Sequence, residues 1–269
     1  MKKYLALILV SIFITSCNNN DDVLSHDNKY TEYIIEKSIS SDINFMPKEL
    51  HEGSGVVEKP SLKLELVTTK IFPCVNYEIT TTVFIKNDEL IIRFEEIFIS
   101  NICFTAFGPA VSYVSLPENI KTLTLINGDN IDKYSIEINT HQVSISLIEN
   151  NFTNSLYNKT FRFPEKTFAY VCGTNTNNTY LYTDFLTLLQ NNPLLTEHTF
   201  NGDGRIPYPE KSSGHWVDKP SVFFKYTNEL DFDELGQVLD IFSSQYLTPT
   251  NDVTISLTNW ENKKHYSWD

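Results

Sequence analysis

Six histidines are the first candidates for chemistry, because an imidazole can act as a general base and as a metal ligand near neutral pH. They stand at His26, His51, His141, His198, His215 and His265. No two of them have the HExxH spacing that places two imidazoles on one face of a helix. The histidines therefore predict neither a metal site nor a catalytic base.

Ser54 lies between two glycines, which invites comparison with the nucleophile of a hydrolase. A nucleophile elbow has the order Gly-x-Ser-x-Gly at a turn between a strand and a helix. Here Gly53 and Gly55 adjoin the serine directly, and we expect no strand before His51 and Glu52. The segment is interpreted as a flexible loop.

Paired carboxylates are another source of acid–base catalysis, and Glu95-Glu96 and Asp231/Asp233 are such pairs. The chain has 34 acidic residues, so pairs arise by chance. Adjacent residues of a strand point to opposite faces, so Glu95 and Glu96 are not expected to work together. The nine glycines form no phosphate-binding loop.

The segment 199–210 is similar in part to the calcium loop of an EF-hand. Loop positions 3, 5, 6, 8 and 12 are Asn201, Asp203, Gly204, Ile206 and Glu210. Position 1 is Thr199 in place of Asp, and position 7 is the cation Arg205. Pro207 and Pro209 oppose the helix that should leave such a loop. A β-turn explains the same Gly and Pro residues, so we expect a turn, with calcium as the alternative.

Aromatic side chains near turns and near the C-terminus could anchor a glycan or a protein. They are Tyr113, Tyr208, Trp216, Trp260, Tyr266 and Trp268. The simpler interpretation is that each ring fills a core, since large aromatic side chains are mostly buried. Trp216, Trp260 and Trp268 are the rings whose exposure would favour a binding surface.

Four cysteines are present, at Cys17, Cys74, Cys103 and Cys172. Cys74 and Cys103 lie near the ends of two neighbouring strand-like runs, so we predict a disulfide between them. Cys172 stands in an apolar run and is expected to be a small buried hydrophobe. No cysteine or histidine spacing indicates zinc, and we expect no metal or cofactor.

The first sixteen residues have the three parts of an export signal. Lys2 and Lys3 are followed by an apolar stretch over residues 4–14 and by the small residues Thr15 and Ser16. A bilayer requires about 20 apolar residues, so this stretch is not expected to be a permanent transmembrane helix.

Residues 14–17, Ile-Thr-Ser-Cys, resemble the lipobox of bacterial lipoproteins. Ile14 and Ser16 match the apolar and the small position, whereas Thr15 is a less usual small residue. The resemblance covers only the region around the signal and implies cleavage before Cys17, which would carry the lipid. An ordinary signal followed by a chance cysteine is the alternative.

Residues 18–22, Asn-Asn-Asn-Asp-Asp, cannot pack and predict a solvated tether, which we extend over residues 17–59. This run is similar to the acidic segment of some Gram-negative lipoproteins that are displayed on the outer face. We expect a cell-envelope protein, lipid-anchored to the outer membrane and exposed at the cell surface. An inward-facing anchor is the alternative.

The formal net charge of −13 becomes −15 once Lys2 and Lys3 are removed. Nucleic-acid binding requires a basic footprint, so we expect no nucleic-acid partner. The charge also opposes direct contact with an anionic membrane except through the lipid.

The stretch 60–158 has the texture of short strands separated by turns. Val, Ile, Thr, Tyr and Phe are enriched, and the runs recur every 8–12 residues. Tyr134, Ile136 and Ile138 alternate with Ser135 and Glu137, which gives one buried and one solvated face. We predict an immunoglobulin-like β-sandwich here, in architecture only.

We predict a smaller α+β domain over residues 159–269. Two helical faces, over residues 180–190 and 232–246, lie among strand-like runs at 168–171, 198–200, 221–226 and 253–257. An Asp231/Glu234 pair is close to a capping box at the start of the second helix. The order strand-helix-strand-strand-helix-strand is that of the ferredoxin-like fold.

These observations favour a non-catalytic binding or scaffolding module with a glycan or protein ligand, attached to the membrane by its lipid. One alternative is an envelope hydrolase whose site is assembled at the junction of the two domains. The other is an accessory subunit of an envelope complex that uses an exposed strand edge.

Overall fold

The computed structural model describes residues 29–53, 56–99, 101–209, 211–213, 216–247 and 252–268. The predicted signal over residues 1–16, the lipid site Cys17, Ser54 and Glu210 lie outside the described residues. The chain divides into two compact units, Met1–Ile34 and Ile35–Asp269. In the first unit, the described residues include the short 3-10 helix η2 (Thr31–Tyr33).

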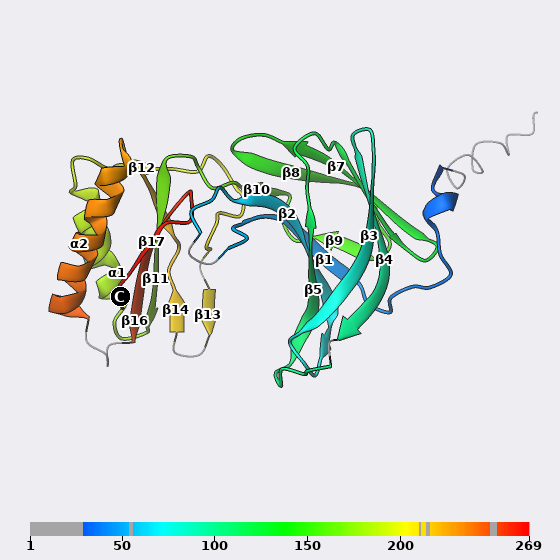
Figure 1. Ribbon diagram of the computed structural model, residues 1–269, viewed down its shortest axis with the longest axis horizontal. Helices are drawn as coiled ribbons and strands as arrows, with labels where there is room; N and C mark the ends of the chain where they lie inside the picture. Colours follow the sequence, from blue (N-terminus) through cyan, green and yellow to red (C-terminus); the bar gives the residue numbers. More distant parts are fainter. Residues whose placement is uncertain are drawn as a thin grey trace, which may run out of the picture. The chain divides into compact units, whose positions relative to one another are not determined.

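The second unit is mostly β, with a large curled sheet and a small second sheet (Figure 1). Over the residues that the structure describes, the large sheet has ten strands. They are β1 (Ile43–Leu50), β2 (Ser61–Phe72), β3 (Tyr77–Lys86), β4 (Glu89–Ile99), β5 (Gly108–Ser115), β6 (Thr122–Asn127), β7 (Asn130–Ile138), β8 (Gln142–Glu149), β9 (Thr153–Ser155) and β10 (Lys159–Phe161).

The strand order β10-β8-β7-β6-β4-β3-β5-β2-β1-β9 explains why the sheet curls. Its two edge strands, β9 and β10, are consecutive in the chain, and residues 156–158 alone join them. The amide of Leu156 donates to the carbonyl of Phe45 in β1 (2.9 Å), and the amide of Ile145 in β8 donates to the carbonyl of Asn158 (2.8 Å). A link this short reaches little beyond about 10 Å, so both edges of the sheet must come together.

The core of the large sheet follows from the period-2 pattern of its strands. Tyr134 and Ile136 of β7 are buried, and the intervening Ser135 is exposed, as the alternation predicts. The ring of Phe45 meets that of Tyr134 edge-on at 4.8 Å, which is a favoured aromatic geometry.

Strand β1 lies inside the stretch 17–59 that we predicted as a tether, so that prediction is wrong for residues 43–50. Ile43 and Phe45 are fully buried, and β1 pairs with β2 along its whole length. Pro47 and the charges at Lys48 and Glu49 interrupt the apolar alternation, which concealed the strand. The strand also ends directly before His51, where we expected none.

The second sheet is built around the long central strand β11 (Thr167–Asn175) (Figure 1). The remaining elements are α1 (Tyr180–Gln190), β12 (Thr196–His198), β13 (Lys211–Ser213), β14 (Trp216–Asp218), β15 (Val222–Lys225), α2 (Glu229–Tyr246), β16 (Val253–Asn259) and β17 (Lys264–Tyr266). Strands β12, β15, β11 and β16 neighbour one another in that order, and every pair is antiparallel. The expected order of strands and helices is present, with the β13–β14 hairpin inserted and β17 added.

Helices α1 and α2 lie on the same side of this sheet (Figure 1). Phe232, Leu235, Leu239 and Phe242 form the buried face of α2, as their spacing predicts. Tyr246, the last residue of the face predicted over residues 232–246, is exposed because it ends the last turn of the helix.

The capping box of α2 lies earlier than predicted. Asn228 is the N-cap: its side chain accepts from the amide of Asp231 (3.2 Å), whose carboxylate accepts from the amide of Asn228 (3.1 Å). We had assigned the cap to Asp231 with Glu234. Asn is as good an N-cap as Asp, so the three-residue shift keeps the same chemistry.

Within the residues described, no helix is long and apolar enough to cross a membrane. The domain ranges 60–158 and 159–269 stay a prediction, since the contacts place residues 35–269 in one unit.

Candidate ligand-binding site

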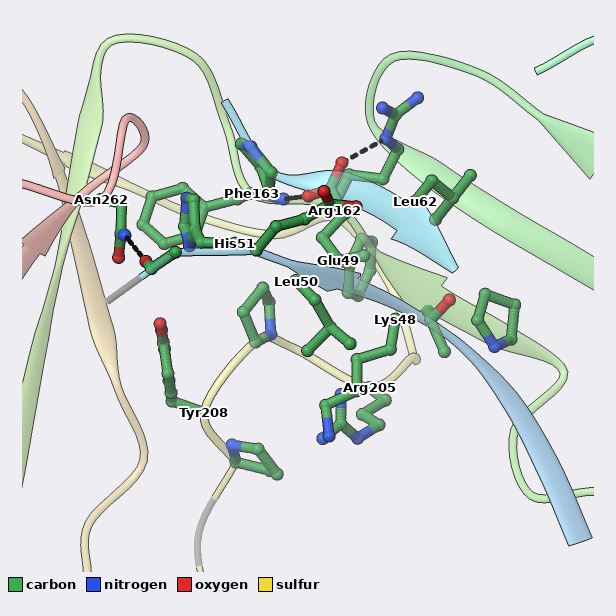
Figure 2. Close-up of a pocket in the computed structure, with 18 of the residues that line it drawn as sticks. Lys48, Glu49, Leu50, His51, Leu62, Arg162, Phe163, Arg205, Tyr208 and Asn262 are labelled. Carbon is green, nitrogen blue, oxygen red and sulfur yellow. Dashed lines mark hydrogen bonds and ion pairs between the residues drawn. The ribbon is translucent and has the colours of Figure 1, made fainter. Parts of the chain in front are cut away.

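A cavity of about 540 Å³ lies between the end of β1, the segment that follows β10, the loop 205–209 and the start of β17 (Figure 2). Its walls thus come from both sheets. Small-molecule sites occupy roughly 300–1,000 Å³, so the volume suits a ligand of modest size. The apolar part of the lining is Pro47, Leu50, Pro60, Leu62, Phe161, Phe163, Pro207, Tyr208 and Pro209.

The alternation of β1 decides which of its side chains face the cavity. Figure 2 shows Lys48 and Leu50 on the side of Arg205 and Tyr208, whereas Glu49 points the other way. Glu49 accepts from Nε of Arg162 (2.7 Å) and from the amide of Phe163 (2.5 Å). Its carboxylate is therefore held by the segment between the two sheets.

Arg162 is fully engaged by protein groups. Besides Glu49, its guanidinium donates to both carboxylate oxygens of Glu118 (2.9 Å each) and to the carbonyl of Asn139 (3.0 Å). Burial opposes the charged form, but the hydrogen bonds and charges of Glu49 and Glu118 outweigh it and raise the pKa of Arg162. Arg162 is thus a structural clamp.

Among the described residues, Arg205 and Lys264 are the cavity cations that have no acidic partner. Within the described residues, no carboxylate lies at ion-pair distance from either side chain. Arg205 instead lies over the ring of Tyr157, 5.8 Å from its centre. Lys48 differs, because its Nζ is 2.8 Å from a carboxylate oxygen of Glu65.

Glu52 is the other acidic residue of the cavity wall, and it is also paired. Its carboxylate lies 2.9 Å from Nζ of Lys63 and accepts weakly from Ser61 (3.4 Å). The hydrogen bond and the charge of Lys63 lower the pKa of Glu52. Neither cavity glutamate is thus left to neutralise Arg205 or Lys264.

Tyr208 has an unusual backbone for a cavity residue. Its φ is +52°, in the left-handed region that disfavours side chains with a Cβ, and the following Pro209 restricts it further. Ser221 holds the turn: its amide donates to the carbonyl of Tyr208 (3.3 Å) and its hydroxyl to that of Pro207 (2.7 Å). Strain of this kind concentrates at functional sites.

The environment of the Tyr208 ring is partly apolar. The ring meets Phe163 edge-on at 6.5 Å, and its face remains partly exposed. Burial of the hydroxyl raises the pKa of Tyr208, with a smaller contribution from Tyr266. Tyr208 therefore contributes an uncharged ring, on a strained backbone, to the cavity that Arg205 and Lys264 also line.

The loop that resembled an EF-hand is fixed to the large sheet. The amide of Arg205 donates to the carbonyl of Lys159 (3.0 Å), and the carbonyl of Arg205 accepts from the amide of Phe161 (2.8 Å). The structure describes no group of three His, Cys, Asp or Glu side chains that could hold a metal. Glu210, the expected last ligand, lies outside the described residues.

The three tryptophans have different environments. Trp260 is buried in the core of the second sheet, which removes it as a surface anchor. Trp216 donates to Asp218 (2.6 Å) and lies against Gly173. Trp268 is exposed and stacks on Tyr266 at 4.6 Å, and neither residue is part of the cavity lining.

Tyr113 is not part of the cavity lining. Its hydroxyl donates to Glu65 (2.8 Å). Burial, followed by the bond to Glu65, raises the pKa of Tyr113 to about 12.

The predicted disulfide between Cys74 and Cys103 is confirmed. Cys172 is buried as expected, and burial raises the pKa of its thiol to about 11.

The pair Glu95-Glu96 lies at a β-bulge, which breaks the alternation on which our expectation relied. Glu95 nevertheless binds Thr82 and Arg93, whereas Glu96 binds Lys37, so the two carboxylates do not act together.

Sequence reasoning missed Lys264 and noticed Arg205 only as a poor calcium position. The one local signal was Pro207-Tyr208-Pro209, whose flanking prolines mark a constrained aromatic residue.

Comparison with models of protein families, with curated proteins and with solved structures finds no match for this chain.

Proposed function

We propose that the chain is a lipid-anchored cell-envelope protein that binds an anionic ligand in the cavity between its two sheets. The observation that carries this proposal is the pairing pattern of the cavity charges. Glu49 and Glu52 are held by Arg162 and Lys63, whereas Arg205 and Lys264 have no acidic partner among the described residues. Charges in a partly enclosed site are costly to leave unpaired, so a ligand anion would complete them.

The side chains that line the cavity indicate which chemical class of ligand it binds. Tyr208 offers a ring face, as sites for sugars do, and Arg205 offers a planar donor that fits a carboxylate or a sulfate. An acidic saccharide combines both groups. We therefore assign the ligand to this class, in preference to a neutral glycan.

The engaged carboxylates favour binding over hydrolysis. A glycosidase requires one carboxylic acid and one carboxylate that reach the substrate. Glu49 faces away from Arg205 and Tyr208, and both of its carboxylate oxygens accept hydrogen bonds. Lys63 lowers the pKa of Glu52, whereas a general acid near neutral pH needs a raised pKa. This is what separates the binding module from the envelope hydrolase.

The finer fold assignments are part of the proposal. The curled sheet with one apolar interior supports a sandwich of immunoglobulin-like architecture. The antiparallel order β16-β11-β15-β12, with both helices on one face, supports a ferredoxin-like second domain.

The lipid anchor at Cys17 and the surface location rest on the lipobox-like residues 14–17 and the acidic run that follows. Protease shaving of intact cells tests the location. We expect the chain to be cut while the cells remain whole. Survival until the outer membrane is permeabilised would contradict surface display.

The ligand assignment can be tested with the fragment of residues 35–269, which contains both sheets as one compact unit. Calorimetric titration with trigalacturonate should give at least tenfold tighter binding than titration with neutral galactotriose. Arg205→Gln should weaken trigalacturonate binding about tenfold or more, since a charge-assisted hydrogen bond contributes roughly 1.5–3 kcal/mol.

Lys121→Gln is the matched control, because it removes one positive charge from an exposed ion pair with Asp88, and Lys121 is not part of the cavity lining. Its affinity should equal that of the wild type. Equal losses in the two variants would attribute binding to net charge and contradict the site.

A further inference from the structure

Two connections at one end of the large sheet form a cross-linked tip (Figure 1). Residues 73–76 connect β2 to β3, and residues 101–107 belong to the connection from β4 to β5. The disulfide between Cys74 and Cys103 joins them. We call these two segments the disulfide tip.

The disulfide tip exposes large apolar side chains. Phe107 is 81% exposed and Ile102 is 67% exposed. Exposed apolar side chains on or beside the tip are Ile71, Val75, Phe98, Ile102, Phe104 and Phe107. Single exposed apolar residues are ordinary on a protein surface, but a contiguous group marks an interaction site.

The backbone of the tip is well organised beneath these side chains. Asn76 donates to the carbonyl of Ile102 (2.6 Å) and accepts from the amide of Phe104 (3.0 Å). The amide of Val75 donates to the carbonyl of Phe104 (3.2 Å). The disulfide and these hydrogen bonds hold the apolar side chains outward instead of allowing them to collapse together.

The charge pattern indicates what covers the tip. Charged residues make up 20% of the chain, yet residues 71–77 and 97–117 contain none. A protein-binding surface usually carries a polar and charged rim around its apolar centre. A surface that enters hydrocarbon must instead be free of charge over its whole depth.

The side chains at the border of the tip have the character of a membrane interface. Tyr77 stacks on Phe72 with ring centres 4.6 Å apart, and Nζ of Lys70 lies 5.5 Å from the centre of the Phe72 ring. Tyrosine and lysine are favoured where hydrocarbon gives way to headgroups, because each has an apolar body and a polar end.

We propose that the disulfide tip inserts into a lipid bilayer and gives the chain a second membrane contact besides the lipid. The apolar part of the bilayer would cover the exposed side chains of the tip. Binding would not require charged lipid headgroups. This inference is independent of the cavity and of the ligand assigned to it. The lipid proposed at Cys17 would hold the chain at the membrane through a solvated tether, which does not fix its orientation, so a second contact would orient the protein on the surface.

Vesicle sedimentation of the fragment of residues 35–269 tests this proposal without the N-terminal apolar stretch. The fragment should bind phosphatidylcholine vesicles, and 30% phosphatidylglycerol should not strengthen binding, since the chain is acidic. Phe107→Asp should lower the partition coefficient at least tenfold, because a charge replaces a buried ring. Binding that requires the anionic lipid would overturn hydrophobic insertion.

Ile85→Asp is the matched control, since Ile85 is an exposed apolar residue at the other end of β3. It should bind vesicles like the wild type, and both variants should keep the wild-type melting temperature. Failure of the wild-type fragment to bind, or equal binding by Phe107→Asp, overturns the proposal. The alternative is that a second copy of the chain covers the tip, and sedimentation velocity tests it. A wild-type dimer that Phe107→Asp dissociates would assign the tip to a dimer interface and overturn membrane insertion.

Discussion

Glu49 of β1 is bound to Arg162, which lies in the segment that leads from the large sheet to β11. Nε of Arg162 lies 2.7 Å from the carboxylate, and both side chains are largely buried. The second carboxylate oxygen accepts from the amide of Phe163. This bond fixes Phe163, against which the ring of Tyr208 rests, so the clamp positions the cavity wall.

Removing the clamp should destabilise the chain. Glu49→Ala leaves the buried guanidinium of Arg162 without its main partner, which typically costs about 3–5 kcal/mol. Urea unfolding of the fragment of residues 35–269 measures this loss. Glu118→Gln is the control: Glu118 is exposed, so its loss should cost about 1 kcal/mol or less. Equal losses in the two variants would contradict the clamp.

The disulfide should stabilise the fragment by constraining its unfolded chain. Cys74 and Cys103 are 29 residues apart, for which loop closure predicts roughly 3–4 kcal/mol. The variant Cys74→Ser/Cys103→Ser should lose this amount in urea unfolding. A thiol titration of the denatured fragment should give one free thiol, Cys172, before reduction and three after it. Three thiols before reduction would exclude the bond.

Gly173 should not tolerate a side chain. A Cβ there would lie 2.5 Å from the indole of Trp216 and 2.7 Å from the carboxylate of Asp218. Gly173→Ala should therefore lower the free energy of unfolding by about 1–3 kcal/mol. In the double variant with Trp216→Ala, the cost of the added methyl group should largely vanish, because its main obstacle is gone. If the losses of stability in the two single variants simply add in the double variant, the contact with Trp216 does not cause the effect of Gly173→Ala.

The stability of the fragment should depend on His265 in acid. Burial of His265 against Phe232 lowers its pKa below 6.5, although the backbone of Phe232 and the charge of Asp233 oppose this. The unfolded chain then binds the proton more readily than the folded chain, so stability falls as the pH drops below 6.5.

His265→Gln should make the free energy of unfolding less dependent on pH below 6.5. Urea unfolding at several pH values between 5 and 7.5 measures this dependence. An unchanged slope in His265→Gln would show that other groups determine the acid sensitivity.

Local patterns predicted the features that depend on neighbours in the chain. The alternation of Tyr134 and Ile136 and the helical spacing of Phe232 and Leu239 report which face is buried, and these faces are confirmed. The disulfide was predictable because both cysteines stand at strand ends. Strand β1 was missed because Pro47 and two adjacent charges masked its apolar residues.

The cavity could not be predicted in the same way. Lys48, Arg162, Arg205, Tyr208 and Lys264 come from segments far apart in the chain and meet only once both sheets have formed. The spacing of these residues does not indicate that Glu49 neutralises Arg162, while Arg205 has no acidic partner in the part of the chain that the structure describes. Whether an aromatic side chain faces a cavity or a core likewise depends on the completed sheet.

Mapping of the trigalacturonate site by NMR tests the central claim most directly. In an ¹⁵N-labelled fragment of residues 35–269, titration should shift the amides around Lys48 to Glu52, Arg205 to Pro209 and Asn262 to Lys264. The amides of the disulfide tip should remain unchanged. Shifts confined to other surfaces, or no shifts at saturating ligand, would contradict a binding site for an acidic saccharide between the two sheets.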